Sequence, residues 1–287
     1  MFEGLQPLIR KYSNTIQAWR LDDKNITRTM MSDSTALIAR LRRIAAGTGP
    51  AHAVAAPVDA WLAQGLGRAQ LHEIYAIEGE DGPSGAGFGI ASTLAAGALP
   101  LLWLRTEAGE RSQGRLHATG LIELGLCAES LVLGVVADEA ALLRAAADAA
   151  RCAGLGTVLV ESIGRAPGFD LTATRRLMLA AESSGVTILS LRIGAEPTPS
   201  AAATRWGVAA VPSTALDQGA GEGAPGFPAF DVECLRRRGG PAGQRWRVEW
   251  DRDAKSFRGA SLSGAGLSVA PGRAAARHPA ASVRAGR

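Results

Sequence analysis

The sequence predicts an α/β fold in which a mainly parallel sheet is flanked by helices, with antiparallel edge strands near the C-terminus. From residue 71 onward, continuous Val/Ile/Leu segments alternate with helical segments, which is typical of a parallel sheet covered on both faces. After residue 195, prolines and glycines break the chain into short strands instead. The 287 residues are 47% hydrophobic and 20% charged, a balance that excludes wholesale disorder.

Four regions follow from the change of composition along the chain. Residues 1–29 lack the Ala/Gly bias of the rest, and we interpret them as an upstream extension, with translation beginning at Met30 or Met31. Residues 30–57 predict an amphipathic helix over 35–46 and then a Gly/Pro/Ala linker. The core domain is expected over 58–258. Residues 259–287 contain arginines but no acidic residue, which predicts a disordered basic tail.

The core domain is expected to begin with a short helix and then to alternate. The predicted strands cover 71–77, 99–104, 130–136, 157–162 and 186–193. A glycine-rich turn is expected over 79–89, and the predicted helices cover 58–66, 88–97, 111–124, 138–152 and 170–184. Asp138 and Asp170 are suited to cap the last two helices, and Gly185 to end the final one. Short strands are expected around 207–211, 230–235 and 245–250.

The charge is distributed unevenly. The chain has a formal net charge of +4, but residues 235–287 carry +9 and residues 30–234 carry −7. An acidic body with a basic C-terminal end suits an anionic partner, either nucleic acid or an acidic protein surface. A solvated basic tail is the alternative. Only three of the 31 basic residues are lysines (Lys11, Lys24 and Lys255), so no lysine is available to a mechanism in the core.

The cysteines and histidines give no sign of a disulfide framework or a metal site. Three cysteines and four histidines are widely spaced, with neither a CxxC nor a Cys/His cluster. An odd, scattered set of cysteines favours a reducing cytoplasm. No apolar run reaches the ~18 residues of a membrane span, so we expect no membrane association.

The glycine-rich segment after the first strand of the core has the context of a phosphate-binding loop. A P-loop has the pattern G-x-x-x-x-G-K-[ST]. When Gly85 is taken as its second glycine, Glu80 stands at the first glycine, Ala86 at the lysine and Gly87 at the hydroxyl. Both groups that would hold phosphate and Mg²⁺ are therefore missing, and Glu80 adds negative charge. Losing one such preorganised group typically costs about 10²–10³ in rate, so we expect no ATP hydrolysis.

Two other interpretations of this segment, which includes Gly82, stay open. A dinucleotide fingerprint starting at Gly85 fails at Ile90, where glycine or alanine is required, although Glu107 lies at the distance of a ribose-binding acid. The second interpretation is a flexible glycine turn that binds no ligand. Either way, the expected cofactor is none, and ATP is disfavoured.

Several segments together resemble the ImuA-type proteins, RecA-superfamily relatives encoded in bacterial damage-inducible mutagenesis cassettes. The resemblance spans roughly residues 35–258. Its specific parts are LTATRRL (171–177), SAAATRW (200–206) and the RGG…WRVEW segment that ends at Trp250. The resemblance implies a RecA-like core with an inherited but lapsed ATPase. By position, Glu107 resembles the acid that activates the attacking water, and Glu161-Ser162 resembles the end of the Walker B strand, where aspartate is usual.

The resemblance also implies a role and partners. We expect a non-catalytic accessory or adaptor protein in SOS-induced, error-prone translesion DNA synthesis. The implied partners are an ImuB-type Y-family-like protein, an error-prone replicative-type polymerase and RecA itself. The expected location is the cytoplasm, with nucleoid association after damage. The alternatives are an ATP-dependent or DNA-binding RecA-like protein, and a damage-induced cell-division inhibitor.

A basic-aromatic strip near the C-terminus is the first candidate surface for a protein partner or DNA. Arginines clamp carboxylates or phosphates, and tryptophan provides a large anchor or a stacking platform. Strand alternation would place Trp246 and Trp250 on one face and Arg245 and Arg247 on the other. The alternative is that both tryptophans belong to the core. The strip consists of Arg236, Arg237, Arg238, Arg245, Trp246, Arg247 and Trp250. The helix expected over 35–46 is a second candidate for partner docking.

Overall fold

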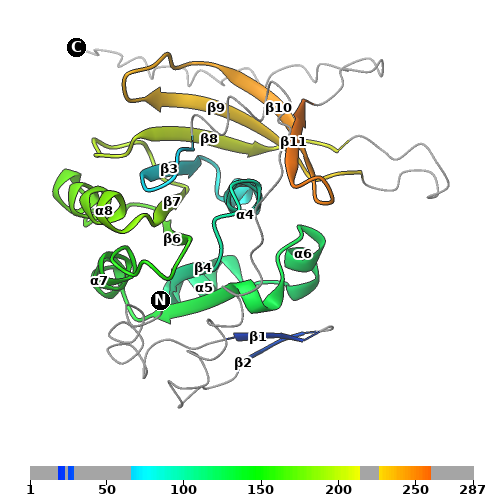
Figure 1. The fold of residues 1–287 in the computed structure, drawn as a ribbon, viewed down its shortest axis with the longest axis horizontal. Helices are drawn as coiled ribbons and strands as arrows, with labels where there is room; N and C mark the ends of the chain where they lie inside the picture. Colours follow the sequence, from blue (N-terminus) through cyan, green and yellow to red (C-terminus); the bar gives the residue numbers. More distant parts are fainter. Residues whose placement is uncertain (1–18, 23–24, 29–65, 214–225, 260–287) are drawn as a thin grey trace, which may run out of the picture.

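A nine-stranded mixed sheet forms the centre of the protein (Figure 1). The computed structural model describes residues 19–22, 25–28, 66–213 and 226–259. The strand order is β11-β10-β9-β8-β3-β7-β6-β4-β5. The strands from β8 to β5 run parallel, whereas β9, β10 and β11 are antiparallel to their neighbours. The predicted fold class, a mainly parallel sheet with antiparallel edge strands near the C-terminus, is confirmed.

The parallel strands form where the sequence is continuously apolar. Their bounds are β3 Leu71–Ala76, β4 Leu101–Thr106, β5 Leu131–Val136, β6 Thr157–Ile163, β7 Thr187–Ile193 and β8 Thr204–Ala210. β3, β5 and β7 are buried along their whole length because helices cover both faces. The positions of the five strands predicted before residue 195 are correct to within two residues.

Helices α7 (Glu139–Ala149) and α8 (Leu171–Ser184) cover one face of the sheet (Figure 1). The carboxylates of Asp138 and Asp170 accept hydrogen bonds from the backbone N–H groups of the first helical turns, as the sequence predicts. Gly185 ends α8 in the left-handed conformation with φ of 81°. Both helices therefore begin, and α8 also ends, where local sequence chemistry places them.

Helices α4 (Gly82–Ala95) and α6 (Ala118–Glu123) pack on the opposite face, and α5 (Glu107–Gln113) follows β4. The single helix predicted over 111–124 is wrong. The chain forms two helices there because Gly114, at φ of 78°, ends α5 and the His117 side chain caps α6. Two short 3₁₀ turns, η2 (Gly79–Asp81) and η3 (Ala128–Ser130), precede α4 and β5.

The antiparallel part is longer than the sequence predicts. Its strands are β9 Ala229–Arg237, β10 Arg245–Asp251 and β11 Ser256–Gly259, the last of which was not predicted. Aromatic side chains from α4, β8, β9, β10 and β11 join this part to the parallel part in one core. The ring centroid of Phe88 lies 6.2 Å from that of Trp206 and 5.5 Å from that of Phe257.

Few of the predictions for the N-terminal region fall on described residues. Two short strands, β1 (Trp19–Asp22) and β2 (Asn25–Arg28), pair antiparallel within the region interpreted as an extension. The helix expected over 35–46, the linker to residue 57 and almost all of the helix over 58–66 lie outside the described residues, as does the tail after residue 259. Among the described residues, no helix is long and apolar enough to cross a bilayer.

Candidate functional site

The glycine-rich segment is a helix rather than a turn. α4 begins at Gly82, so Gly85, Ala86 and Gly87 lie in its first turns and the turn predicted over 79–89 is wrong. The glycines are used for close packing against the sheet. A Cβ atom at Gly85 would lie 2.8 Å from Leu191 Cδ1. One at Gly82 would lie 3.2 Å from Ile193 side-chain carbons, and one at Gly87 would lie 3.3 Å from the Phe230 ring.

The approach to α4 is acidic. Glu80 is exposed in the 3₁₀ turn, and Asp81 occupies the N-cap position without forming a side-chain cap. The Asp81 carboxylate instead accepts a 2.8 Å hydrogen bond from the backbone N–H of Ala210. Two acidic residues of the chain thus come directly before the positive end of the helix dipole. Ala86, half-buried in the helix, brings no cation to this end.

Glu107 is the first residue of α5, where the side chain of Thr106 caps the helix. Its side chain is exposed to solvent. A carboxylate at a helix N-terminus is stabilising on its own, which explains Glu107 without any catalytic role. The structure therefore places Glu107 at the carboxyl end of the strand β4, as expected, but shows it on the surface.

Glu161 belongs to a buried ion pair that the sequence analysis missed. Its Oε1 atom lies 2.9 Å from Arg105 Nη2, with the two side chains 3% and 2% exposed. Trp103 Nε1 donates to Glu161 Oε2 at 2.9 Å, and Arg105 Nη1 donates to the Gly114 carbonyl at 3.0 Å. Both carboxylate oxygens are thus occupied. The only sequence signal was Trp103 and Arg105 alternating on one face of an apolar strand.

The neighbouring Ser162 points to the other face of the sheet, as alternation requires. It is 6% exposed, and its hydroxyl has no hydrogen-bond partner among the described residues. The two residues of the expected Walker B pair therefore lie on opposite faces, with Glu161 paired on the α4 side and Ser162 buried on the α8 side.

The arginines of the basic-aromatic strip are spread over β9, the following turn and β10. Arg245 forms a bidentate contact with Asp231, at 2.7 and 2.5 Å, yet its side chain is 63% exposed. The fork with Asp231 raises the pKa of Arg245 further above its ordinary value. Arg238 is exposed and donates to the Ala201 carbonyl at 2.7 Å, whereas Arg247 donates to the Pro212 carbonyl.

The remaining strip residues are more enclosed. Arg236 is half-buried and donates to the Ser200 carbonyl at 3.1 Å, and Arg237 is also half-buried. Trp250 is fully buried, and its indole N–H donates to the Leu124 carbonyl at 2.9 Å. Trp246 is half-buried and packs against the same core. Trp250 thus acts in the core, and the exposed part of the strip consists mainly of Arg238 and Arg245.

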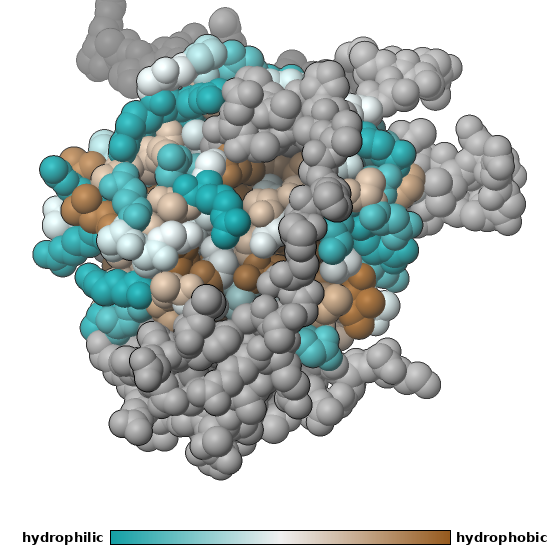
Figure 2. Space-filling view, viewed as in Figure 1, coloured by the Kyte–Doolittle hydropathy of each residue, from teal (hydrophilic) through white to brown (hydrophobic). Residues whose placement is uncertain are grey.

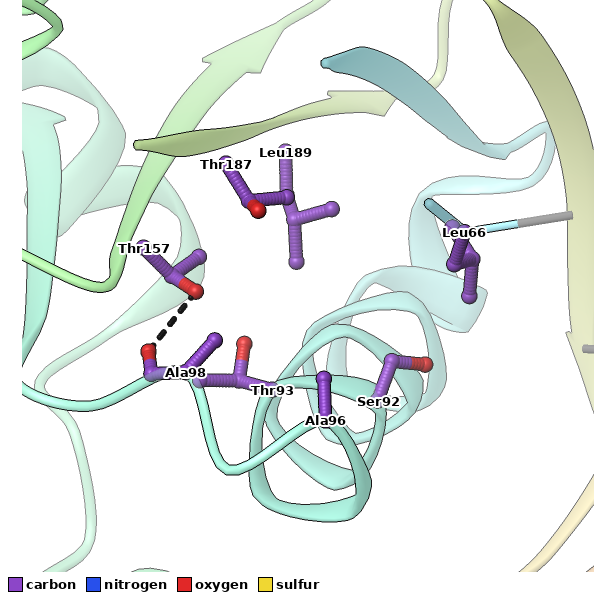
Figure 3. Close-up of a pocket in the computed structure, with 8 residues that line it drawn as sticks. All are labelled: Leu66, Ser92, Thr93, Ala96, Ala98, Thr157, Thr187 and Leu189. Carbon is purple, nitrogen blue, oxygen red and sulfur yellow. Dashed lines mark hydrogen bonds between the residues drawn. The ribbon is translucent and has the colours of Figure 1, made fainter. Parts of the chain in front are cut away.

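A small cavity lies at the amino ends of the strands β6 and β7 (Figure 3). Leu66, the C-terminal part of α4 and the first residues of β6 and β7 line it, with room for about one water molecule. Thr157 Oγ1 donates to the Ala98 carbonyl at its edge (Figure 3). Ligands of open α/β sheets bind at the carboxyl ends of the strands, so this cavity is in the wrong place for a nucleotide. Among the described residues no group of His, Cys, Asp or Glu side chains could hold a metal ion.

The observations define a mixed α/β protein with a mostly parallel central sheet, in which a tightly packed glycine-rich helix follows the strand β3. No protein-family model matches the chain. The resemblance to ImuA-type proteins is confirmed by similarity to Protein ImuA from two strains of Caulobacter vibrioides, NA1000 / CB15N and ATCC 19089 / CIP 103742 / CB 15. Each is 36% identical over 138 residues, which cover 45% of this chain and 54% of the relative.

The match thus covers only about half the length of these relatives. Among solved structures, the RadB recombinase is similar with a TM-score of 0.45 and 11% identity, over 72% of this chain and 98% of that one.

Proposed function

We propose that the protein is a non-catalytic accessory protein of damage-induced, error-prone translesion DNA synthesis, built on a RecA-like core. Its similarity to Protein ImuA supports this role. The carrying observation is that Glu161, at the position of the Walker B acid, is buried in an ion pair with Arg105. A carboxylate with both oxygens occupied is not available to a metal ion or a water molecule. The proposed location is the cytoplasm, with nucleoid association after damage.

The arrangement around α4 supports the absence of ATP hydrolysis. The nucleotide loop is degenerate at Ala86 and Gly87, and Gly85 packs on the sheet where a phosphate cradle would need an open loop. The acids Glu80 and Asp81 would repel a triphosphate at the helix N-terminus. Neither phosphate cation nor Mg²⁺ ligand is supplied, and no cofactor is proposed.

ATP turnover by the purified full-length chain tests this part of the proposal. We expect no turnover above that of a protein-free blank, with or without single-stranded DNA, and the same result for Glu107→Gln. A turnover that the wild type shows and Glu107→Gln abolishes would overturn the proposed loss of catalysis. Such an enzyme would instead be the ATP-dependent RecA-like protein.

The proposed partners are an ImuB-type Y-family-like protein, an error-prone replicative-type polymerase and RecA. We propose that the exposed arginines Arg238 and Arg245 contact an acidic surface of such a partner. Although both make contacts within the fold, a surface ion pair such as Arg245–Asp231 is worth only about 0–1 kcal/mol, so it is readily exchanged for a partner carboxylate.

A pull-down with the ImuB-type protein of the same cassette tests the surface. We expect the double variant Arg238→Glu/Arg245→Glu to lose at least tenfold in affinity, because two like charges then face the acidic partner. Arg144→Glu, an exposed arginine on α7, is the control and should bind as the wild type does. Equal binding by all three proteins would remove the strip from the interface.

Direct DNA binding by the same arginines is the second candidate, favoured by the +9 charge of residues 235–287. In that case, affinity for a single-stranded oligonucleotide should fall steeply with salt concentration and depend on Arg238 and Arg245. Absence of a mobility shift, or a shift that does not depend on salt, would discard direct DNA binding. The arginines would then remain candidates only for a protein partner.

A further inference from the structure

A row of buried polar side chains crosses three neighbouring parallel strands near their carboxyl ends. In the sheet register, Tyr75 of β3 is paired with Arg192 of β7, and Arg192 is paired with Ser162 of β6. Neighbouring strands lie about 4.7–4.9 Å apart, so the three paired side chains are neighbours on one face of the sheet. Ser190 lies on the same face of β7, two residues before Arg192. The strands β3, β7 and β6 lie side by side in Figure 1.

Each of these four side chains has at least one buried polar atom without a hydrogen-bond partner among the described residues. The hydroxyls of Tyr75, Ser162 and Ser190 and the Nε and Nη1 atoms of Arg192 are buried without a partner among the described residues. Burial is the main reason that the pKa of Tyr75 is raised, and the Glu73 carboxylate raises it further, while Arg205, Arg192 and the backbone of Thr198 act to lower it. The phenol is therefore a neutral donor. A buried donor without an acceptor is destabilising, and here five such atoms lie on four neighbouring side chains.

The charges of the buried groups do not balance. Arg105 is paired with Glu161, and Arg205 is paired with Glu73 at 2.8 Å. Arg192, only 3% exposed, has no carboxylate partner among the described residues. Its guanidinium lies 4.9 Å from the Phe169 ring centroid, a cation–π contact that stabilises part of the charge. That contact leaves the Nε and Nη1 donors of the guanidinium unused, and a buried charge without an opposite charge is costly.

We propose that Arg192, with the hydroxyls of Tyr75, Ser162 and Ser190, binds a compact free oxyanion at the carboxyl ends of β3, β7 and β6. The anion supplies the negative charge that the fold omits and accepts from donors that otherwise have no acceptor. All four groups donate, so they select an acceptor-rich ligand such as phosphate or a small carboxylate. The near-complete burial of Arg192 favours a small ion over the side chain of a partner protein.

Thermal unfolding of the full-length protein in inorganic phosphate tests the site. At about 20 mM phosphate we expect a saturable rise in Tm of roughly 5 °C over chloride of equal ionic strength. Acetate in a parallel series distinguishes a carboxylate ligand from a phosphate-like one. Phosphate also stabilises proteins by exclusion from their surface. Arg176→Met, an exposed arginine on α8, measures that general effect and should respond as the wild type does.

The decisive variant is Arg192→Met, which keeps the length of the side chain and removes its charge. If the site is an anion site, this variant lacks the saturable rise and has a higher Tm than the wild type in anion-free buffer. If Arg192 only stabilises the fold, Arg192→Met has a lower Tm than the wild type and still shows the saturable response to the anion. Ser162→Ala and Ser190→Ala keep the charge and should weaken the apparent anion affinity severalfold, should Arg192→Met fail to fold. A wild-type response no greater than that to chloride overturns the proposal.

Discussion

At the scale of single residues, His72 shows how burial fixes a protonation state. Its Nε2 atom donates to the Gly67 carbonyl at 2.7 Å, so Nδ1 accepts from Thr204 Oγ1 at 2.8 Å. Thr204 Oγ1 in turn accepts from Trp206 Nε1 at 2.7 Å. This chain of donors requires a neutral imidazole. Desolvation lowers the pKa of His72 to about 4, although the bond to Gly67 acts to raise it.

This pKa predicts a loss of stability in acid. Above pH 6.5 the imidazole is neutral in both states and contributes no pH dependence. As the pH falls from 6.5 towards 4, the unfolded chain binds a proton and the folded chain does not, so the free energy of unfolding falls by on the order of 3 kcal/mol. Urea titrations at pH 7 and pH 4.5 measure this loss. His72→Gln should be destabilised at pH 7, and its deficit relative to the wild type should shrink at pH 4.5. A constant deficit at both values would contradict the assignment.

Some candidate site residues could be judged from the sequence, whereas others required the structure. Ala86 could be judged from the sequence, because a missing side chain is missing in any fold. The role of Glu161 could not, since its partners Trp103 and Arg105 lie 58 and 56 residues away along the chain. Arg192 was likewise hidden inside an apolar strand, where only the three-dimensional structure shows that none of the described carboxylates is paired with it.

At the scale of elements, helix α4 is defined by what packs beneath it. Glycine inside a helix normally costs about 0.5–1 kcal/mol relative to alanine, so its repeated use in α4 needs a reason. The reason is proximity to the sheet, with Gly82, Gly85 and Gly87 all set against side chains of β7 or β9. The glycine cluster predicted a turn because glycine clusters usually mark turns. Tertiary packing against the sheet instead favours the helix.

A matched pair of substitutions tests the packing role. We expect Gly85→Ala to lower the free energy of unfolding by about 1–2 kcal/mol, because its Cβ would overlap the buried Leu191 side chain. Gly120→Ala in α6 should be neutral or stabilise by up to about 1 kcal/mol, since the nearest atom to its Cβ, His117 Nδ1, is 3.7 Å away. Chemical denaturation followed by circular dichroism measures both. A gain of stability in Gly85→Ala would show that α4 does not need this close approach.

At the scale of the whole molecule, the parallel and antiparallel parts share one aromatic core. Phe257 of the edge strand β11 has its ring centroid 5.1 Å from that of Trp250 and 5.5 Å from that of Phe88 in α4. The C-terminal strands are therefore not a separable appendage. The surface is mixed in character, and Figure 2 shows hydrophobic patches over α8 and α6, where Leu171 is 54% and Ile122 41% exposed.

The shared core predicts cooperative unfolding. Phe257→Ala should lower the free energy of unfolding by about 3–5 kcal/mol, the usual cost of truncating a buried aromatic residue. Circular dichroism and tryptophan fluorescence should follow one coincident transition in the wild type. Ile77→Ala is the control, because that side chain is 48% exposed and its loss should change stability by less than about 0.5 kcal/mol. Two separate transitions, with Phe257→Ala affecting only one, would contradict a single core.

The sequence by itself determined the alternation of strands and helices, the caps at Asp138 and Asp170 and the absence of a lysine at position 86. These features depend on local periodicity and on side chains acting within a few residues of their own position. Only the tertiary structure decided that the glycine segment is a packed helix, that Glu161 is paired with Arg105, that Trp250 is buried, and that Arg192 has no carboxylate partner among the described residues. Each of these depends on neighbours brought together across the sheet from distant parts of the chain, and a buried charge or a close contact is defined only by those neighbours.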